Sequence, residues 1–106
     1  KCIGLRFFTV YGEWGRPDMF IFKYLNASLG SKKTFYLNNF GNHLRDFTYI
    51  KDVCEILKKL INIKINKKHL ILNISSNNPV KITEVIKGID KLTLQKAKIK
   101  KIKWAF

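Results

Sequence analysis

The hydrophobic positions along the chain follow two spacings, one typical of buried strands and one typical of amphipathic helices. Residues 3–10 form a nearly continuous apolar run with several β-branched and aromatic side chains, which predicts a buried strand of a parallel sheet. Residues 70–74 predict a second buried strand. Two shorter segments, residues 34–37 and 44–49, are expected to be extended.

Three segments predict helices. Residues 19–29 are largely apolar and follow Pro17 and Asp18, which favour the start of a helix. Residues 50–63 and 82–92 repeat apolar side chains at helical spacing, so each predicts an amphipathic helix. Because strands alternate with helices, the pattern predicts an α/β fold.

The connections are marked by glycine, asparagine and proline, and three loops are expected at residues 11–17, 38–43 and 75–79. The pattern changes after Thr93. Residues 96–103 alternate lysine with apolar residues, and no glycine, proline or capping residue marks an element there. We assign residues 1–92 to one domain and residues 93–106 to an atypical basic tail.

The net charge of the chain limits the kinds of ligand or partner that it attracts. Its 106 residues suffice for one small domain, the formal net charge is +14, and 14 of the 21 basic residues lie after position 50. A basic surface attracts phosphorylated metabolites, nucleic acid or an anionic membrane. However, 18 of the basic residues are lysines and isoleucine and asparagine are abundant, so a compositional bias without any specific ligand is the alternative explanation.

Cys2 and Cys54 lack the spacing of a metal site, and Cys54 falls in an apolar helical pattern that predicts a small core residue. We therefore expect no metal, a reducing compartment and a cytoplasmic location. No run approaches ~20 apolar residues, so no membrane span is expected. The first residue is not methionine and a core strand follows at once, so we expect further chain to precede Lys1.

Two motifs carry a family resemblance. The first is GLRFFTVYG at residues 4–12, continued by WGRPDM at residues 14–19, and the second is RDFTYI at residues 45–50. Both resemble the extended short-chain dehydrogenase/reductase family of NAD-dependent epimerases and dehydratases, and the first is most similar to the UDP-glucuronate 4-epimerase branch. Weaker matches at residues 72–74 and 78–80 extend the resemblance over roughly residues 3–92.

The resemblance implies an α/β fold, the C-terminal substrate-binding portion of a Rossmann-type nucleotide-sugar epimerase that lacks the N-terminal cofactor domain. Residues 1–92 would be that substrate-binding part. Such enzymes use NAD to oxidise the sugar at C4 and return the hydride to the other face. The branch interconverts UDP-glucuronate and UDP-galacturonate for cell-surface polysaccharide synthesis. The implied partners are a UDP-sugar, the missing cofactor domain from the same or a split gene, and a second copy in a homodimer.

The resemblance assigns the nucleotide to two residues. Arg45 matches the arginine that grips the UDP diphosphate, and its planar fork suits phosphate oxygens. The open alternatives for Arg45 are an ion pair with Asp46 and a surface arginine at the end of a strand. Tyr36 matches the region that lines the uracil and ribose, with a half-buried strand tyrosine as the alternative.

Four residues would face the sugar and the cofactor. Thr9 matches a sugar contact and Arg16 matches the partner of the hexuronate carboxylate, with an ordinary strand residue and a solvated loop arginine as the alternatives. Phe7 and Phe8 match the segment beside the nicotinamide, and core packing is their alternative. His43 and His69 have no partner that the sequence can name.

The catalytic motifs of the family are absent from the sequence. No Gly-x-x-Gly-x-x-Gly turn occurs, and no tyrosine is followed four residues later by lysine. We therefore name no catalytic residue and expect the chain alone to be inactive. Glu13 stands where the family has proline, and Lys51 where it has an acidic residue. A further substrate-binding arginine of the family, beyond position 92, is absent.

Other functions remain open. The RDF motif also fits another NAD-dependent nucleotide-sugar dehydratase or decarboxylase, and a truncated chain could be a non-functional remnant. A small basic nucleic-acid-binding module is a third alternative, with Trp104 and Phe106 as stacking residues. Against it, the lysines are scattered and no nucleic-acid-binding motif occurs.

Overall fold

The structure is a computed structural model that describes residues 1–30 and 34–103. Its backbone contacts divide the chain into two compact units, and each unit is built from two separate segments. The first unit contains Lys1–Trp14 and Asp46–Pro79. The second contains Gly15–Arg45 and the described residues from Val80 onward.

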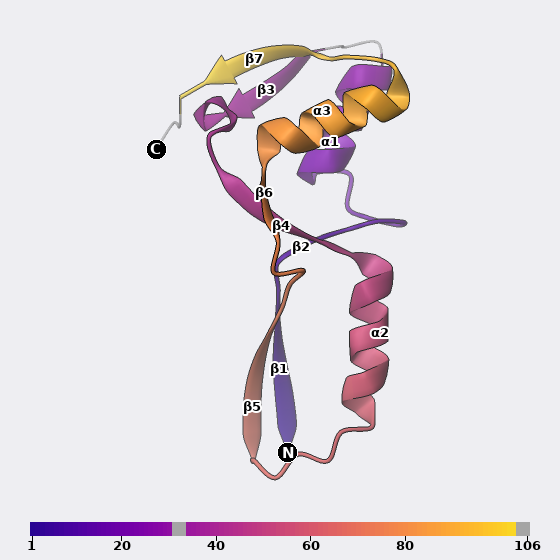
Figure 1. The fold of residues 1–106 in the computed structure, drawn as a ribbon, viewed down its shortest axis with the longest axis vertical. Coiled ribbons are helices and arrows are strands. Elements are labelled where there is room, and N and C mark those ends of the chain that lie inside the picture. The colour runs from indigo at the N-terminus through magenta and orange to yellow at the C-terminus, as the bar shows by residue number, and fades with distance from the viewer. Residues whose placement is uncertain (31–33, 104–106) are drawn as a thin grey trace. The chain divides into compact units, whose positions relative to one another are not determined.

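The first unit is built on parallel strand pairs. β1 (Cys2–Phe7) pairs with β5 (His69–Ile74) along its whole length (Figure 1). β2 (Thr9–Tyr11) pairs with β4 (Leu44–Tyr49), with Thr9 opposite Phe47. The sheet order is β2-β4-β6, in which Val80 and Lys81 of β6 (Pro79–Lys81) are assigned to the second unit, as Leu44 and Arg45 of β4 are. α2 (Ile50–Ile61) follows β4 directly.

The predicted strand at residues 3–10 is divided at Phe8. The backbone N–H of Phe8 donates to the carbonyl of Ile74 at 3.1 Å, at the end of the ladder with β5, and Thr9 then begins the ladder with β4. The strand is interrupted because its two halves have different partners. The parallel pairing was predicted correctly, but the burial was not, since Phe7 and Phe8 are 47% and 51% exposed.

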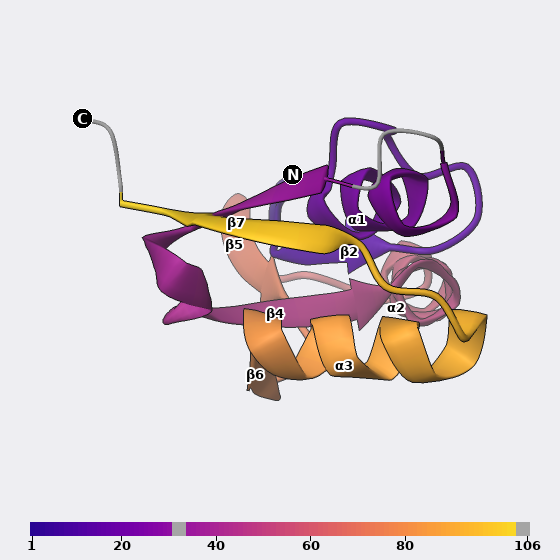
Figure 2. The ribbon, with the colours of Figure 1, turned by 90° about the horizontal axis from the view of Figure 1, so that it is seen from above.

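The second unit combines two helices with a two-stranded sheet. α1 (Phe20–Leu29) precedes β3 (Thr34–Asn38), and α3 (Ile82–Thr93) precedes β7 (Lys98–Ile102). β3 and β7 lie side by side (Figures 1 and 2). They pair in parallel, with Tyr36 opposite Lys100. The core of this unit consists mainly of buried side chains from α1, β3 and α3: Tyr24, Ala27, Leu37, Ile82 and Ile86.

β7 lies in the tail for which the sequence predicted no element, and β6 begins at the end of a predicted loop. The alternation of lysine with Ala97 and Ile99 is the period of a strand with one face covered, because successive side chains point to opposite faces. Ala97 is buried and Ile99 is half-buried, whereas Lys98 and Lys100 are exposed. Trp104 and Phe106 lie outside the described residues.

A tight turn joins β3 to β4. The short 3-10 helix η1 (Asn39–Gly41) contains Phe40 and Gly41 at φ values of 55° and 77°. A Cβ on Gly41 would lie 2.8 Å from Cγ2 of Thr83, so this position requires glycine. The carbonyl of His43 then accepts from the backbone N–H of Ile82 at 3.3 Å, which fixes the start of β4 against α3.

The three predicted helices are confirmed, each within a few residues of its expected ends. Cys54 does not take the core position expected from its pattern, because it is exposed on α2, as Cys2 is on β1. Within residues 1–30 and 34–103, no helix is long and apolar enough to cross a membrane.

Candidate functional site

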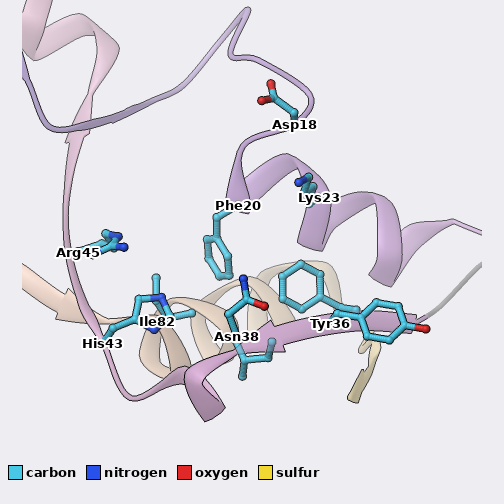
Figure 3. A pocket seen from close by; sticks show the side chains of 10 residues that line it. Asp18, Phe20, Lys23, Tyr36, Asn38, His43, Arg45 and Ile82 are labelled. Carbon is cyan, nitrogen blue, oxygen red and sulfur yellow. The ribbon is translucent and has the colours of Figure 1, made fainter. Parts of the chain in front are cut away.

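A pocket of about 250 Å³ opens in the second unit between α1, β3 and the start of β4 (Figure 3). Its apolar wall comes from Phe20, Phe35, Leu37 and Ile82. Six polar residues line the remainder: Asp18, Lys23, Tyr36, Asn38, His43 and Arg45. The structure thus brings together Arg45 and Tyr36, the two residues that the sequence assigned to the nucleotide.

Packed aromatic rings form the wall of this pocket. The ring centroids of Phe20 and Phe35 are 5.8 Å apart, and those of Tyr24 and Phe35 are 5.2 Å apart, both edge to face. The Tyr24 hydroxyl donates to the Asp90 carboxylate on α3 at 2.6 Å. The wall therefore has a packed support that joins α1, β3 and α3.

Arg45 has a charge that no neighbouring carboxylate neutralises. Its guanidinium donates to the carbonyl of Leu44 at 3.3 Å, and the side chain is exposed. Among the described residues, no carboxylate forms an ion pair with Arg45. In Figure 3, Arg45 lies beside His43 on one side of the pocket, and Tyr36 lies on the other. A free guanidinium at a pocket wall is suited to phosphate oxygens.

Asp46 is bound elsewhere and is not the ion-pair partner that was left open for Arg45. Its carboxylate accepts from the backbone N–H of Ser76 at 2.9 Å, from that of Asn78 at 3.1 Å, and from the hydroxyls of Ser76 and Thr48. Burial alone would raise the pKa of Asp46, but these hydrogen bonds outweigh it and hold the pKa below its ordinary value. Asp46 thus anchors the loop after β5.

A loop ion pair borders the pocket. Arg16 donates from Nε to Oδ1 of Asp18 at 3.0 Å and from Nη2 to Oδ2 at 2.5 Å, which is the bidentate geometry of arginine with a carboxylate. The hydrogen bond from Arg16 lowers the pKa of Asp18. Arg16 does not line the pocket itself, but its partner does. Arg16, which the sequence predicted to bind a substrate carboxylate, is thus already paired with the carboxylate of Asp18.

His43 and Lys23 are pocket residues that sequence reasoning missed. Burial lowers the pKa of His43, and the nearby charge of Arg45 lowers this pKa further. Lys23 adds a second cation from α1, on the same helix as Phe20. Its spacing of three residues from Phe20 was the available signal, because residues three apart share a helix face.

A second hollow of about 400 Å³ continues the pocket along β3. Its lining residues are Lys23, Thr34, Phe35, Tyr36 and Asn38. Four of these five also line the first pocket, so the two hollows adjoin the same residues and are together called the β3 trough below. Tyr36 borders both parts, with 57% of its surface exposed.

The other predicted site residues, Phe7, Phe8 and Thr9, lie in the first unit where β1 ends and β2 begins. Thr9 is half-buried and pairs with Phe47 of β4. Phe7 and Phe8 have about half of their surfaces exposed, so neither is fully packed in a core. Phe7 ends the parallel strand β1, and α/β sheets bind ligands at the carboxyl ends of their strands.

The chemistry of the β3 trough suits ligand binding. Its residues supply cations, an aromatic ring and an imidazole, which suits an anionic ligand. Within the described ranges, no group of three or more His, Cys, Asp or Glu side chains could hold a metal ion. The residues present also lack a glycine-rich turn between strand and helix, so they do not fit a complete dinucleotide site.

The sequence model of the NAD dependent epimerase/dehydratase family matches residues 1–75. The chain belongs to this family. The match includes β1, β2, α1, β3, β4, α2 and β5, and therefore both motifs that carry the resemblance. The family resemblance predicted from the sequence is confirmed.

Curated relatives of this epimerase/dehydratase chain are considerably longer. An uncharacterized protein of Methanocaldococcus jannaschii is 48% identical over 101 residues, which cover 94% of this chain and 30% of that protein. UDP-glucuronate 4-epimerase 5 of Arabidopsis thaliana is 37% identical over 110 residues, which cover 92% of this chain and 25% of that enzyme. The chain therefore spans about a third or less of the relatives it matches.

Solved structures confirm the fold class. MoeE5 in complex with UDP-glucuronic acid and NAD has a TM-score of 0.86 at 33% identity, covering 95% of this chain and 33% of MoeE5. UDP-glucuronic acid 4-epimerase from Bacillus cereus, with the same two ligands, has a TM-score of 0.82 at 29% identity, with 93% and 31% covered. TunA, an NAD-dependent NDP-hexosamine 5,6-dehydratase, has a TM-score of 0.76 at 29% identity, with 93% and 31% covered.

Proposed function

We propose that the chain is the nucleotide-sugar-binding part of a 4-epimerase that interconverts UDP-glucuronate and UDP-galacturonate through an NAD-dependent 4-keto intermediate, for cell-surface polysaccharide synthesis in the cytoplasm. The observation that carries the proposal is the free guanidinium of Arg45 in the same trough as Tyr36. Relatives and solved structures that carry UDP-glucuronate in their names support this choice of sugar nucleotide.

Each predicted site residue has one role in the proposal. Arg45 binds the diphosphate by charge-assisted hydrogen bonds, and Tyr36 lies along the uracil and ribose. Thr9 contacts the sugar, and Arg16 binds the hexuronate carboxylate. Phe7 and Phe8 lie beside the nicotinamide.

The proposed partner is a cofactor domain that supplies the glycine-rich turn for NAD and the Tyr-x-x-x-Lys base. Exposed apolar side chains in the first unit support such a partner: Phe7, Phe8, Ile61 and Ile71 are each 47% or more exposed. NAD, when bound there, accepts and returns the C4 hydride. We expect the chain alone to bind its ligand without turnover, and the assembled enzyme to be a homodimer.

A second candidate is a nucleotide-sugar dehydratase, which the similarity to TunA favours. The two proposals differ in the sugar, because a hexosamine lacks the carboxylate that Arg16 would bind. UDP-glucuronate and a UDP-hexosamine, titrated in parallel, separate the two. Preference for UDP-glucuronate that disappears in Arg16→Ala supports the epimerase, and preference for the hexosamine supports the dehydratase.

The same purified chain also tests the two remaining alternatives, a nucleic-acid-binding module and a non-functional remnant. Binding of random-sequence DNA with steep salt dependence and no response to UDP would favour the former. A folded chain that binds neither ligand would be the remnant.

The main test is calorimetric titration of the chain with UDP-glucuronate. Arg45→Ala should weaken binding by about tenfold or more, because charged hydrogen bonds to the diphosphate are lost. Arg6→Ala is the matched control, since Arg6 is an exposed arginine on β1, outside the trough. Equal loss in the two variants, or no binding by the unsubstituted chain, would contradict the proposed site.

A further inference from the structure

The basic tail becomes part of the second unit through β7. This strand pairs with β3 in parallel, and the register places Lys100 opposite Tyr36, Lys98 opposite Thr34 and Lys101 opposite Leu37. Neighbouring residues across a ladder lie on the same face of the sheet, so their side chains are close. The pairing therefore determines which lysine of the tail lies beside Tyr36.

The ammonium group of Lys100 lies close to the aromatic ring of Tyr36. The Nζ atom of Lys100 lies 5.9 Å from the centroid of the Tyr36 ring, which is within the range of a cation–π interaction. Both side chains are exposed, so solvent or a ligand can reach the pair. Among the described residues, no carboxylate forms an ion pair with Lys100.

Tyr36 of this pair borders both parts of the β3 trough, whereas Lys100 lines neither part. Arg45 is the cation on one side of the trough, and Tyr36 lies on the other side in Figure 3. Because Lys100 lies beside Tyr36, β7 supplies a cation next to this tyrosine. An aromatic ring flanked by a cation is suited to a nucleotide, whose base stacks on the ring while its phosphate meets the charge.

We propose that Lys100 is a binding residue for the nucleoside diphosphate moiety of the ligand, acting together with Tyr36. The proposal rests on the proposed function and adds a residue to its site. A base stacked on Tyr36 would bring the adjacent phosphates toward the ammonium group of Lys100, and the opposite charges attract each other. The effect concerns the nucleotide and not the sugar.

Three lysines of one strand provide the test. Lys100→Gln, Lys98→Gln and Lys101→Gln remove the same charge from neighbouring positions, and only Lys100 is opposite Tyr36. Each variant is titrated with UDP, UDP-glucuronate and uridine, with circular dichroism as the check on folding. Lys100→Gln should weaken UDP and UDP-glucuronate by a similar factor of about three to ten and leave uridine nearly unchanged. Lys100→Arg should restore most of the affinity.

The outcomes separate this inference from the function on which it rests. If the unsubstituted chain binds UDP and Lys100→Gln weakens it no more than Lys98→Gln or Lys101→Gln, net charge alone acts and the role of Lys100 is overturned. If Lys100→Gln affects UDP-glucuronate but not UDP, the lysine meets the sugar and the nucleotide role is overturned. If the unsubstituted chain binds no uridine nucleotide, both proposals are overturned.

Discussion

Glu13 and Lys51 form an ion pair, with 3.3 Å between Oε1 of Glu13 and Nζ of Lys51. The Tyr49 hydroxyl also donates to Glu13, with both carboxylate oxygens at 3.0 Å. The charges of Glu13 and Lys51 have opposite sign, so the two side chains attract each other. This pair joins the loop after β2 to the first turn of α2.

The pair predicts a charge-exchange result. Glu13→Lys and Lys51→Glu should each lower the melting temperature by a few degrees, because each leaves two like charges in contact. The double exchange should restore most of the loss, which melting followed by circular dichroism measures. The effect should shrink in 1 M salt, since screening weakens exposed ion pairs. Additive losses in the double variant would mean that the two residues do not interact.

The Tyr24–Asp90 hydrogen bond predicts a stability loss in the second unit. Tyr24→Phe keeps the ring packed on Phe20 and Phe35 and leaves the half-buried Asp90 carboxylate without its donor. The free energy of unfolding should fall by about 1–3 kcal/mol, measured by denaturant titration. Tyr36→Phe is the matched control, because the exposed Tyr36 hydroxyl forms no hydrogen bond among those described. Equal losses would show that the buried hydrogen bond has no special weight.

The raised pKa of Tyr24 predicts that the folded state loses stability at alkaline pH. Burial and the hydrogen bond to Asp90 raise the pKa of Tyr24 from 10.0 to about 12. Because the folded-state pKa lies above the unfolded one, this stabilisation is complete below pH 10 and is lost as pH rises toward 12. Denaturant titrations across that window should show a decline that is smaller in Tyr24→Phe. A decline of equal size in both proteins would exclude Tyr24 as its cause.

The lowered pKa of Asp46 predicts that the folded state loses stability at acidic pH. Its folded-state pKa lies below the ordinary value of 3.8, so its stabilisation is present above that pH and is lost as pH falls. Asp46→Asn should be less stable at pH 7 by about 1–3 kcal/mol, because the charged acceptor of the Ser76 and Asn78 amides is lost. The difference between the two proteins should narrow below pH 4. A constant difference would mean that Asp46 is not the titrating group.

Asp18 predicts a change in ligand preference that depends on the proposed role of Arg16. Because Asp18 already fills the fork of Arg16, a substrate carboxylate must displace it. Asp18→Asn should strengthen UDP-glucuronate binding by about two- to fivefold and leave UDP-glucose unchanged. Glu55→Gln is a control of equal charge change, on α2. Equal gains for both ligands would indicate a general charge effect, and weaker UDP-glucuronate binding would make Asp18 a positioning residue for Arg16.

The sequence correctly predicted the elements that are specified by a pattern of neighbouring residues. The three helices follow from apolar spacing and the strand at residues 70–74 from a short apolar run, and both appear close to the expected bounds. The break at Phe8 could not be predicted, because it depends on partners about 40 and 65 residues away in the sequence. β7 was missed for a similar reason, since lysine is a weak strand former without a paired neighbour.

In the candidate site, too, local motifs predicted some residues, whereas residues positioned by tertiary contacts were missed. Arg45 and Tyr36 were named from motifs, and the structure places both at one trough. Lys23 and His43 come from a helix face and a turn whose positions depend on tertiary contacts, such as the hydrogen bond from Ile82 to His43. The sequence also could not show that Asp18 holds Arg16 or that Asp46 is bound by the loop after β5.

Each unit is assembled from two stretches of chain that are separated by a stretch belonging to the other unit. During synthesis, the first unit therefore stays incomplete until β5 has been made, and the second until β7 has been made. A single proteolytic cut cannot release either unit as one continuous peptide. If a gene were divided inside residues 15–79, neither half would encode a complete unit, so the two products would have to associate before either could fold fully.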